Sequence, residues 1–436
     1  MPVTKLFENQ GGGYVETDYE FIGAQYSSLD IADYDADGDM DILLTGAINE
    51  SPYRLTAIYR NEGDSFTEIS DPFIPVSHGC AKWGDYDMDG DMDILLTGET
   101  LDGATQSGYT GIYRNVNGQW FETPDTSVFL DVRNSSAAWG DVDNDGDLDC
   151  IISGLAFIDG IWQPEAHLYI NDENHFVVAD VYLADHYEGS IVFADFIKDS
   201  KLDIFQCGAN KNNEAESKLF WNHTSIQNTP PSVPANLNAV VDDSIITFSW
   251  DASTDVETAS DGLTYSLRIG SQPLHSDIKM CQSDTTGFRI VPEYGNVGSV
   301  TEWKLNISNL EGGIYWSVQA VDNGYLGSSF AVEQFINLTD IRENEDFLPK
   351  KFALYQNYPN PFNPSTKIKF DVPVSTDVKI VLYNILGEKV RTLVNKKYAP
   401  GRHEYVLEAS GLAAGLYFYR IKTNQYTNTK RMILIK

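Results

Sequence analysis

The residues of this chain best suited to chemistry are aspartates at alternate positions of short loops. In the stretch Gly84-Asp85-Tyr86-Asp87-Met88-Asp89-Gly90-Asp91-Met92-Asp93, carboxylates occupy places one, three, five, seven and nine, counted from Asp85. Calcium takes about six to eight oxygen ligands at roughly 2.3–2.6 Å, and a tight loop can point alternate side chains at one ion while its seventh residue offers a backbone carbonyl. Gly90, at place six, suits a turn that needs positive φ. Without a cation these carboxylates would repel one another. The spacing therefore predicts a calcium loop rather than a solvated acidic turn.

The sequence contains three copies of this loop and a fourth copy in which key positions are replaced. The predicted calcium ligands are Asp33, Asp35, Asp37, Asp39 and Asp41 in the first loop, Asp85, Asp87, Asp89, Asp91 and Asp93 in the second, and Asp141, Asp143, Asp145, Asp147 and Asp149 in the third. The fourth copy keeps Asp195, Asp199 and Asp203, whereas Ile197 replaces the aspartate at place three and Ser200 replaces the glycine. We expect about three calcium ions, with weak or no binding at the fourth loop.

Length and charge narrow the class of protein. A chain of 436 residues exceeds what one hydrophobic core usually serves, so two or three domains are expected. The net charge is −34, and it is unevenly placed: residues 1–349 hold 15 Lys/Arg against 59 Asp/Glu, whereas residues 350–436 hold 15 against 5. So acidic a surface repels phosphate backbones and anionic lipid, which disfavours nucleic acid as a partner.

Two further compositional features argue against a transmembrane helix and against cysteines that form disulfides or bind metal. No run of 18 apolar residues is present, so no transmembrane helix is expected. The four cysteines, Cys80, Cys150, Cys207 and Cys281, form no CxxC pair and lie at non-equivalent repeat positions, which favours small buried side chains over disulfides or metal ligands.

The aspartate loops belong to a longer repeat. Their first aspartates, Asp33, Asp85, Asp141 and Asp195, are 52, 56 and 54 residues apart. A second signature, an apolar stretch closed by asparagine, keeps the same period and ends at Asn9, Asn61, Asn115, Asn171 and Asn222. Within one unit we expect strands at Cys80–Gly84, Ile94–Thr97, Gly111–Arg114 and Gln119–Glu122, the last two joined by a hairpin turn. Four short antiparallel strands per unit predict a β-propeller blade.

Large side chains recur just before the aspartate loops. Trp83 and Trp139 are expected to wedge between blades, with Phe193 and Ile31 at the matching positions. The aromatic members could instead be platforms for sugar rings, but packing is the default interpretation.

Residues 1–226 resemble the FG-GAP/VCBS repeat family, whose best-known members are the propellers of integrin α chains. The resemblance rests on the DxDxDGxxD loop and the apolar strand that follows it. It implies calcium held between the first two strands of a blade, chiefly for rigidity, with partner binding on other loops. The family's pattern carries over to the three intact loops and fails in the fourth.

The sequence does not fix the number of blades. Four aspartate loops accompany five asparagine signatures, and the chain opens inside a blade, with Leu6–Asn9 and Tyr14–Glu16 as its expected last strands. Either Tyr14–Glu16 completes the last blade and closes a four-bladed ring, or the chain is a fragment of a larger propeller. We favour the fragment.

Residues 227–338 follow a different pattern after a proline-rich linker. Expected strands at Ile245–Trp250, Leu263–Ile269 and Gly313–Asp322 predict a β-sandwich. With Trp250 and the Tyr315 to Ala320 pattern, the region resembles a fibronectin type III module, although the loops at 251–262 and 273–298 are longer than usual. Such a module implies a spacer or a protein contact.

The last residues form a distinct, basic part after an expected linker at 339–351. Residues 352–436 alternate as strands of a small β-sandwich and resemble the C-terminal sorting domain of the type IX secretion system. The resemblance rests on Tyr358-Pro359-Asn360-Pro361-Phe362-Asn363-Pro364, on Tyr383–Gly387 and on Gly415-Leu416-Tyr417. It implies recognition by the type IX machinery and a place outside a Gram-negative cell, or on its surface. No signal peptide is recognisable at Met1, which again favours an incomplete N-terminus.

The sequence carries no recognisable catalytic motif. Seven histidines are scattered, and no HExxH, GxSxG or P-loop pattern is present. We therefore expect a non-enzymatic, all-β protein, a propeller followed by two β-sandwiches, that is secreted or displayed and binds an extracellular protein or glycan. One alternative is a polysaccharide-acting enzyme, or an accessory subunit of one, with a site of scattered residues on the propeller. Another is a structural surface-layer component.

Overall fold

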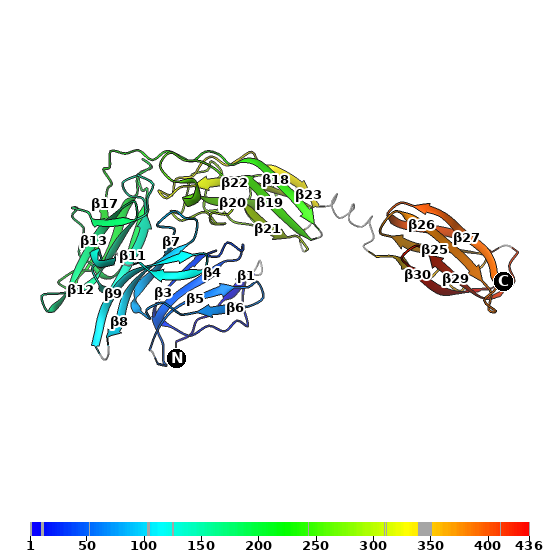
Figure 1. The fold of residues 1–436 in the computed structure, drawn as a ribbon. Helices are drawn as coiled ribbons and strands as arrows, with labels where there is room; N and C mark the ends of the chain where they lie inside the picture. Colours follow the sequence, from blue (N-terminus) through cyan, green and yellow to red (C-terminus); the bar gives the residue numbers. More distant parts are fainter. Residues whose placement is uncertain are drawn as a thin grey trace. The chain divides into compact units, whose positions relative to one another are not determined.

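The computed structural model describes residues 2–9, 13–51, 53–102, 105–123, 126–242, 244–308, 310, 312–338, 351–409 and 411–435. Regular structure in these residues is β, apart from two short 3₁₀ turns (Figure 1). The chain divides into two compact units, residues 1–309 with 314–336 and residues 310–313 with 337–436. The expected linker at residues 339–350 lies outside the described residues. No helix among the described residues is long and apolar enough to cross a membrane.

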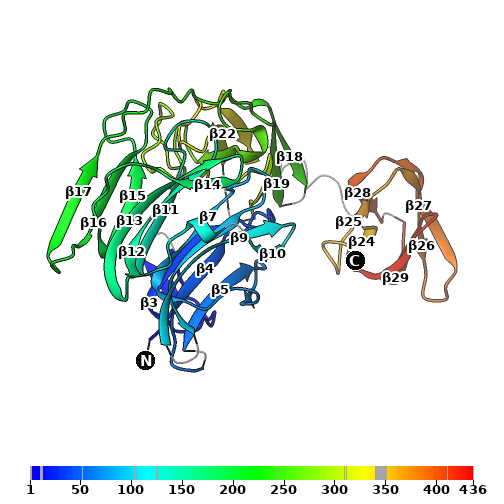
Figure 2. The ribbon, with the colours of Figure 1, turned by 60° about the vertical axis from the view of Figure 1, so that its left-hand side comes forward.

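Four antiparallel sheets follow the repeats and lie side by side in both ribbon views (Figures 1 and 2). The strands of blade 1 are β3 (Gln25–Ala32), β4 (Asp41–Ala47), β5 (Arg54–Asn61) and β6 (Phe66–Ile69). Those of blade 2 are β7 (Ser77–Gly84), β8 (Asp93–Asp102), β9 (Thr105–Val116) and β10 (Gln119–Glu122). Those of blade 3 are β11 (Val132–Gly140), β12 (Asp149–Ile158), β13 (Ile161–Asp172) and β14 (His175–Val178), and blade 4 has β15 (Tyr187–Ala194), β16 (Asp203–Ala209) and β17 (Ala215–Phe220).

The predicted order of strands and loops within each unit is confirmed. Each aspartate loop joins the first two strands of its blade, and the signature asparagine lies within two residues of the end of the third strand. The strands are longer than expected, because β8 and β9 continue as a ladder to Asp102 and Thr105, far beyond the apolar core of the repeat. The all-β fold of propeller blades followed by two sandwiches is therefore shown.

The N-terminal strands do not complete the last blade in the described residues. β1 (Phe7–Asn9) and β2 (Tyr14–Glu16) pair with each other as a separate two-stranded sheet. Among the described strands, β17 pairs with β16 alone. The alternative in which Tyr14–Glu16 closes a four-bladed ring is therefore wrong, because those residues pair with β1 and not with β17.

Aromatic wedges fill the junctions between blades. Trp83 is buried against blade 1, where it stacks on Tyr34 with ring centroids 5.5 Å apart and planes 6° apart. Trp139 repeats this arrangement on Tyr86 at 6.4 Å and 9°. Phe193 is buried in the junction between blades 3 and 4. Packing, rather than sugar stacking, is thus the role that the structure gives these side chains.

The wedge prediction is wrong at Ile31. Its side chain is 56% exposed, since no described blade covers that face of β3. Only the outer part of this face is covered, by Phe21, which packs edge-on against Tyr59 at 5.1 Å.

Residues 235–337 form a β-sandwich, and all of it except residues 310–313 and 337 belongs to the same compact unit as the blades. Because it is the second fold along the chain, we call it the second sandwich. One sheet has the order β18 (Ala235–Asp242), β19 (Ile245–Asp251), β21 (Glu302–Asn306), and the other β20 (Thr264–Gly270), β22 (Gly313–Val321), β23 (Gln334–Asn337). Buried aromatics join the two sheets: Phe248 meets Trp316 at 4.7 Å, and Trp250 meets Tyr265 at 5.6 Å. In both ribbon views this sandwich lies across one end of the blades (Figures 1 and 2).

The C-terminal unit is a sandwich with its own core. Its sheets have the orders β24 (Ala353–Leu354), β25 (Ser365–Val372), β28 (Gly401–Glu408), and β27 (Lys389–Tyr398), β26 (Thr376–Tyr383), β29 (Gly415–Lys422), β30 (Thr427–Leu434). The proline motif folds onto this core: Phe362 is buried, and the buried Asn357 donates from its backbone to the Tyr419 hydroxyl at 2.8 Å. The motif is therefore a structural part of the sandwich rather than a loose extension.

Candidate functional site

The aspartate at place one organises each loop. In all four loops its Oδ1 accepts the backbone N–H of place five and its Oδ2 accepts that of place six, at 2.9–3.1 Å. These bonds bend the backbone into a tight turn and leave place six with φ of +98°, +90° and +101° in the three intact loops, as glycine allows. Gly146 has a second reason to be glycine, because a Cβ there would lie 1.9 Å from the carbonyl oxygen of Glu257.

The aspartate at place nine ties three strands together. Its Oδ2 accepts the N–H of place two, and its Oδ1 accepts the N–H of the signature asparagine at the end of the third strand. The eight bonds measure 2.7–3.2 Å. The four carboxylates concerned, Asp41, Asp93, Asp149 and Asp203, are at most 1% exposed. Place nine is therefore a structural position in every repeat, including the fourth.

The signature asparagine also links neighbouring blades. Asn171 Nδ2 donates to the carbonyl of Tyr86 at 3.1 Å, and Asn222 Nδ2 donates to that of Val142 at 2.6 Å. Both acceptors are at place two of the preceding blade's loop. The spacing of these asparagines was visible in the sequence, but their role between blades was not.

The three intact loops each gather carboxylates that could hold one cation. The grouped residues are Asp33, Asp35 and Asp37 in the first loop, Asp85, Asp87 and Asp93 in the second, and Asp141, Asp143 and Asp149 in the third, with ligand oxygens within 4.8 Å of one another in each group. Among the described residues, buried carboxylate oxygens without a hydrogen-bond partner occur in the second and third loops, at Asp87 Oδ1 and Asp143 Oδ1, and also in the fourth loop, at Asp199 Oδ1. An uncompensated buried carboxylate oxygen is costly without a cation, so these residues fit a hard ion such as calcium.

The place-seven aspartates point elsewhere. Asp91 Oδ2 accepts the N–H of Asn117 at 2.7 Å, and Asp147 Oδ2 accepts that of Glu173 at 2.9 Å. Asp91 and Asp147 therefore brace the hairpin between the third and fourth strands of their blades. Like Asp39, they lie outside the three groups. Asp89 and Asp145, at place five, also lie outside them, as does Asp41 in the first loop.

Arginines offset the charge of the first two loops only. The Arg114 guanidinium pairs with Asp87 through Nε and with Asp89 through Nη2 at 2.9 Å, whereas Arg60 lies 4.0 Å from Asp35. Ile170 stands at the matching position of the third blade. The third loop thus lacks this cationic partner.

Burial sets the electrostatics of the loops. It raises the pKa of Asp33 to about 6, of Asp41 to about 7, of Asp85 to about 8, of Asp141 to about 7 and of Asp149 to about 9. The negative charge of neighbouring aspartates adds to this effect, while hydrogen bonds from backbone N–H groups oppose it. In the absence of a cation, Asp85 and Asp149 would therefore hold protons at neutral pH, whereas Asp33 would already have lost its proton.

The pKa shifts predict how the stability of the metal-free protein depends on pH. Because the folded-state pKa values lie above the ordinary 3.8, their stabilising contribution is complete below about pH 4 and is lost as pH rises through about 6 to 9. In chelator, the melting temperature of the first unit should fall between pH 5 and pH 8. With saturating calcium it should fall much less, because the cation replaces the protons. A chelated melting temperature that rose over this range would contradict the assignment.

The fourth loop keeps the backbone turn but not the grouping of carboxylates found in the other three loops. Asp195 and Asp203 make the same backbone bonds as their counterparts, yet Asp195, Asp199 and Asp203 form no group of the kind found in the other loops among the described residues. Weak or absent calcium binding there stays a prediction.

Substitution of Asp203 tests the structural role of place nine independently of calcium binding. Replacing it with alanine would leave the partly buried N–H groups of Phe196 and Asn222 without these acceptors, at about 1–3 kcal/mol each. We expect Asp203→Ala to lower the free energy of unfolding of the first unit by about 2–5 kcal/mol without changing the number of bound calcium ions. Urea unfolding and calcium counting measure the two effects, and loss of an ion would contradict the prediction.

The second sandwich sits directly on the aspartate loops. Asn323 Nδ2 donates to the Gly146 carbonyl at 2.8 Å, and the Asn323 carbonyl accepts the N–H of Asp141 at 3.2 Å. Ser299 Oγ donates to the Gly90 carbonyl at 3.2 Å. The loops that looked too long for a fibronectin type III module supply part of this contact, since Gly262 packs against Met88 and Glu257 against Gly146. Loop order and domain docking are therefore physically connected.

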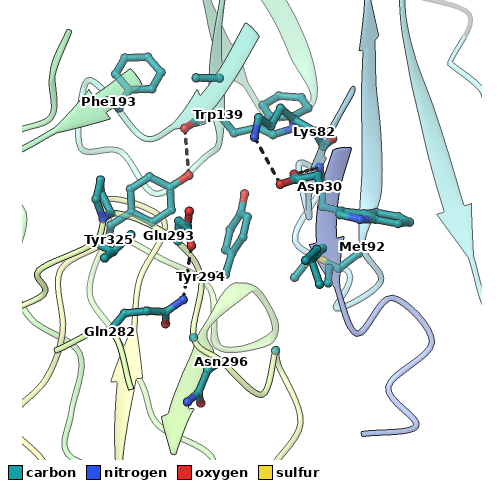
Figure 3. A pocket seen from close by; sticks show the side chains of 18 of the residues that line it. Asp30, Lys82, Met92, Trp139, Phe193, Gln282, Glu293, Tyr294, Asn296 and Tyr325 are labelled. Carbon is teal, nitrogen blue, oxygen red and sulfur yellow. Dashed lines mark hydrogen bonds and ion pairs between the residues drawn. The ribbon is translucent and has the colours of Figure 1, made fainter. Parts of the chain in front are cut away.

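A pocket of about 400 Å³ lies where the first strands of all four blades face the second sandwich (Figure 3). We call this central region the hub. Asp30 from blade 1 and Lys82 from blade 2 form an ion pair of 3.3 Å on its wall. On the opposite side Gln282 Nε2 donates to Glu293 at 3.4 Å. The pocket thus combines charged and amide groups with the edges of buried aromatics.

Tyr294 projects into this hub from the second sandwich (Figure 3). It packs against the aromatic clusters of all three blade junctions. Its buried hydroxyl makes no hydrogen bond among the described residues, although Tyr325 adjoins it with ring centroids 5.7 Å apart. Tyr325 donates its own hydroxyl to the Trp139 carbonyl at 2.9 Å. Sequence reasoning missed both tyrosines, and the unusual length of the 273–298 loop was the only signal for one of them.

Fold and loops together define a β-propeller repeat protein with acidic loops that could hold a cation. Residues 33–96 match the family profile described as FG-GAP-like repeat, and residues 356–436 match that of the secretion system C-terminal sorting domain. The two resemblances seen in the sequence are thereby confirmed, and the sorting domain indicates export to the cell surface or beyond it. No curated protein matches the chain.

Three of the solved structures that match show a distant likeness. The type IX secretion component PorZ of Porphyromonas gingivalis is 12% identical, with a TM-score of 0.21 over 98% of this chain and 62% of its own. A family 43 arabinoxylan arabinofuranohydrolase from Bacillus subtilis is 9% identical, with a TM-score of 0.28 over 94% and 78%. The central fibronectin-III array of RIM-binding protein is 14% identical, with a TM-score of 0.16 over 48% and 69%. Similarities this low carry no argument about function.

Proposed function

We propose that this protein is an exported, calcium-stabilised recognition protein that binds an extracellular glycan or protein and catalyses no reaction. The observation that supports it most is the hub pocket, in which charged, amide and phenol groups converge on a frame built from four blades. A pocket of about 400 Å³ lies within the range of roughly 300–1,000 Å³ usual for small ligands. Calcium in the three loops would hold that frame rigid.

The polar groups of the pocket favour a neutral, hydroxyl-rich ligand. Asp30 and Glu293 would repel an anion, and Lys82 is already paired with Asp30. Sugar hydroxyls can donate to carboxylates and accept from amides and ammonium groups. Tyr294 and Tyr325 line the same pocket. A glycan therefore suits the pocket better than an acidic peptide does.

Binding to glycan and matrix-protein arrays tests this function. The full chain should bind a defined set of neutral glycans with calcium present, and Asp30→Ala should weaken that binding at least tenfold. Exposed Asp159→Ala, at the tip of the β12–β13 hairpin, is the matched control and should have no effect. Failure of every glycan and matrix protein to bind would overturn the proposal.

A polysaccharide-acting enzyme is the second candidate, because two carboxylates, Asp30 and Glu293, line the same pocket. Paired carboxylates flank the scissile bond in most glycoside hydrolases. Product release from a panel of plant and algal polysaccharides, abolished in Asp30→Asn and in Glu293→Gln, would establish the enzyme. Glycan binding without product release would establish the recognition protein.

We further propose that the type IX machinery reads residues 352–436 and removes them at the cell surface. The C-terminal sandwich has its own core, so its loss would leave the other unit intact. Mass spectrometry of the surface protein should find no peptides beyond about residue 350. An intact chain retained inside the cell would contradict this part.

A further inference from the structure

A second pocket, of about 520 Å³, lies between the fourth loop and the second sandwich. Three of its lining residues, Ala194, Pro292 and Tyr325, also line the hub pocket, so the two pockets are neighbours. Arg289 belongs to the wall of the second pocket and not to that of the hub pocket. We call the second pocket the arginine pocket.

Arg289 is a buried cation whose hydrogen-bond partners are all neutral. The residue is 8% exposed, and its Nη2 donates to the backbone carbonyls of Glu293 and Tyr294 and, at 3.4 Å, to the side-chain oxygen of Gln282. Its Nε and Nη1 have no hydrogen-bond partner among the described residues. Arg268, another buried arginine of the same sandwich, has a carboxylate partner, since its Nη2 lies 3.2 Å from Glu333. No such ion pair is present at Arg289 in the part of the chain that the structure describes.

The charge of Arg289 is therefore poorly compensated. Burial lowers the pKa of Arg289 to about 10, so the guanidinium is still charged at neutral pH. Glu293 and Asp322 act on it at longer range, but burial raises the pKa of the Asp322 carboxyl well above its ordinary value, which weakens it as a counter-ion. A buried charge without a partner is destabilising, and the low polarity around it strengthens its attraction for an anion.

Lys198 adds a second cation to the same wall. Its ammonium lies 4.0 Å from the centre of the Phe288 ring, and both residues line the arginine pocket. Asp195 also lines the pocket, but its two carboxylate oxygens accept backbone N–H groups of its own loop. Asp284 acts on Lys198 from outside the wall. Two cations thus face one carboxylate here, although residues 1–349 hold 15 Lys/Arg against 59 Asp/Glu.

We propose that the arginine pocket binds one anionic group, a carboxylate or a sulfate ester, of a glycan whose neutral sugar rings occupy the hub pocket. The inference rests on the proposed function and narrows its ligand to glycans with an acidic substituent. A guanidinium matches the geometry of an oxyanion, and the lysine adds a point charge. Because Asp30 and Glu293 repel an anion from the hub pocket, the acidic and neutral parts of the ligand each have a pocket of their own.

Matched pairs of glycans test this inference. One set pairs oligosaccharides that carry a uronate with the same oligosaccharides after reduction of the carboxyl to an alcohol, and a second set pairs sulfated with desulfated forms. In titration calorimetry of the full chain, with calcium and at low salt, the wild type should bind the acidic member of a pair at least tenfold more tightly. This preference should shrink as salt screens the attraction.

Three variants locate the preference. Arg289→Gln should abolish the ratio of the two affinities, and Lys198→Ala should reduce it at least threefold. Lys198 is exposed, so its variant keeps the test valid if Arg289→Gln does not fold. Lys211→Ala removes an equal charge from the turn between β16 and β17, at the other end of β16 from the fourth loop, and should keep the full ratio.

Failure of this inference can be told apart from failure of the proposed function. If glycans bind but both members of every pair bind equally, or if the preference survives in Lys198→Ala and Arg289→Gln, the arginine pocket is overturned and the hub pocket stands. If no glycan binds, the proposed function fails, and NMR of the full chain labelled with ¹⁵N-arginine tests the arginine pocket alone. Glucuronate or methyl sulfate should then shift the Nε–H signal of Arg289, which is the signal missing from the Arg289→Gln spectrum. A shift with one anion alone identifies the group that the pocket takes, and no shift with either would overturn the inference.

Discussion

Removal of calcium is expected to lower the melting temperature of residues 1–336 by about 15 °C and to leave that of residues 352–435 unchanged. An ion at 100 times its dissociation constant stabilises the folded state by about 2.7 kcal/mol, and three loops would act together. A change of 1 kcal/mol shifts the melting temperature of a domain of 150–250 residues by about 2–4 °C. Docking of the second sandwich on Gly90 and Gly146 predicts that it melts with the blades.

Differential scanning calorimetry of the full chain in calcium and in chelator measures this effect. The C-terminal unit, with its own core and no aspartate group among its described residues, is the internal control. Magnesium in place of calcium should restore little, because it demands a smaller, near-octahedral site. Equal shifts of both transitions, or no shift, would contradict the prediction.

Loss of the wedge at the junction of blades 2 and 3 should be the most damaging single substitution among the aromatics. Trp139 is 4% exposed and packs against Tyr86 and Phe176, while its indole N–H donates to the Lys82 carbonyl at 3.4 Å. Trp139→Ala would leave a cavity at the junction, and the blades cannot move together to fill it. We expect the free energy of unfolding to fall by about 3–5 kcal/mol.

Urea unfolding measures this loss, and Trp221→Ala is the matched control. Trp221 follows the last strand of blade 4 and is 45% exposed, so its removal should change the free energy of unfolding by less than about 0.5 kcal/mol. Equal losses in the two variants would mean that Trp139 is no wedge.

Local pattern was enough to predict the units of this fold. The loop glycines and alternate aspartates located the turns, and the expected hairpin turn located β10, Gln119–Glu122, to the residue. These features depend on neighbours a few residues away, so one sequence contains them.

Contacts between distant segments could not be predicted in the same way. Tyr294 reaches the hub and Tyr325 bonds Trp139 across 186 residues of sequence, which no periodicity records. The place-seven aspartates had the spacing of ligands, but they bond the N–H groups of Asn117 and Glu173, which the sequence could not place beside them. At Ile31 the repeat predicted a buried wedge, but burial depends on the neighbouring blade and not on the repeat itself.

The most direct test of the account is a count of calcium ions per chain after equilibrium dialysis. The three intact loops predict three ions, and the double variant Asp87→Ala with Asp89→Ala should retain two, because Asp87 belongs to the grouped carboxylates of the second loop. Dialysed wild-type protein that retained no divalent ion, or a double variant with an unaltered count, would contradict the assignment of these loops as cation sites.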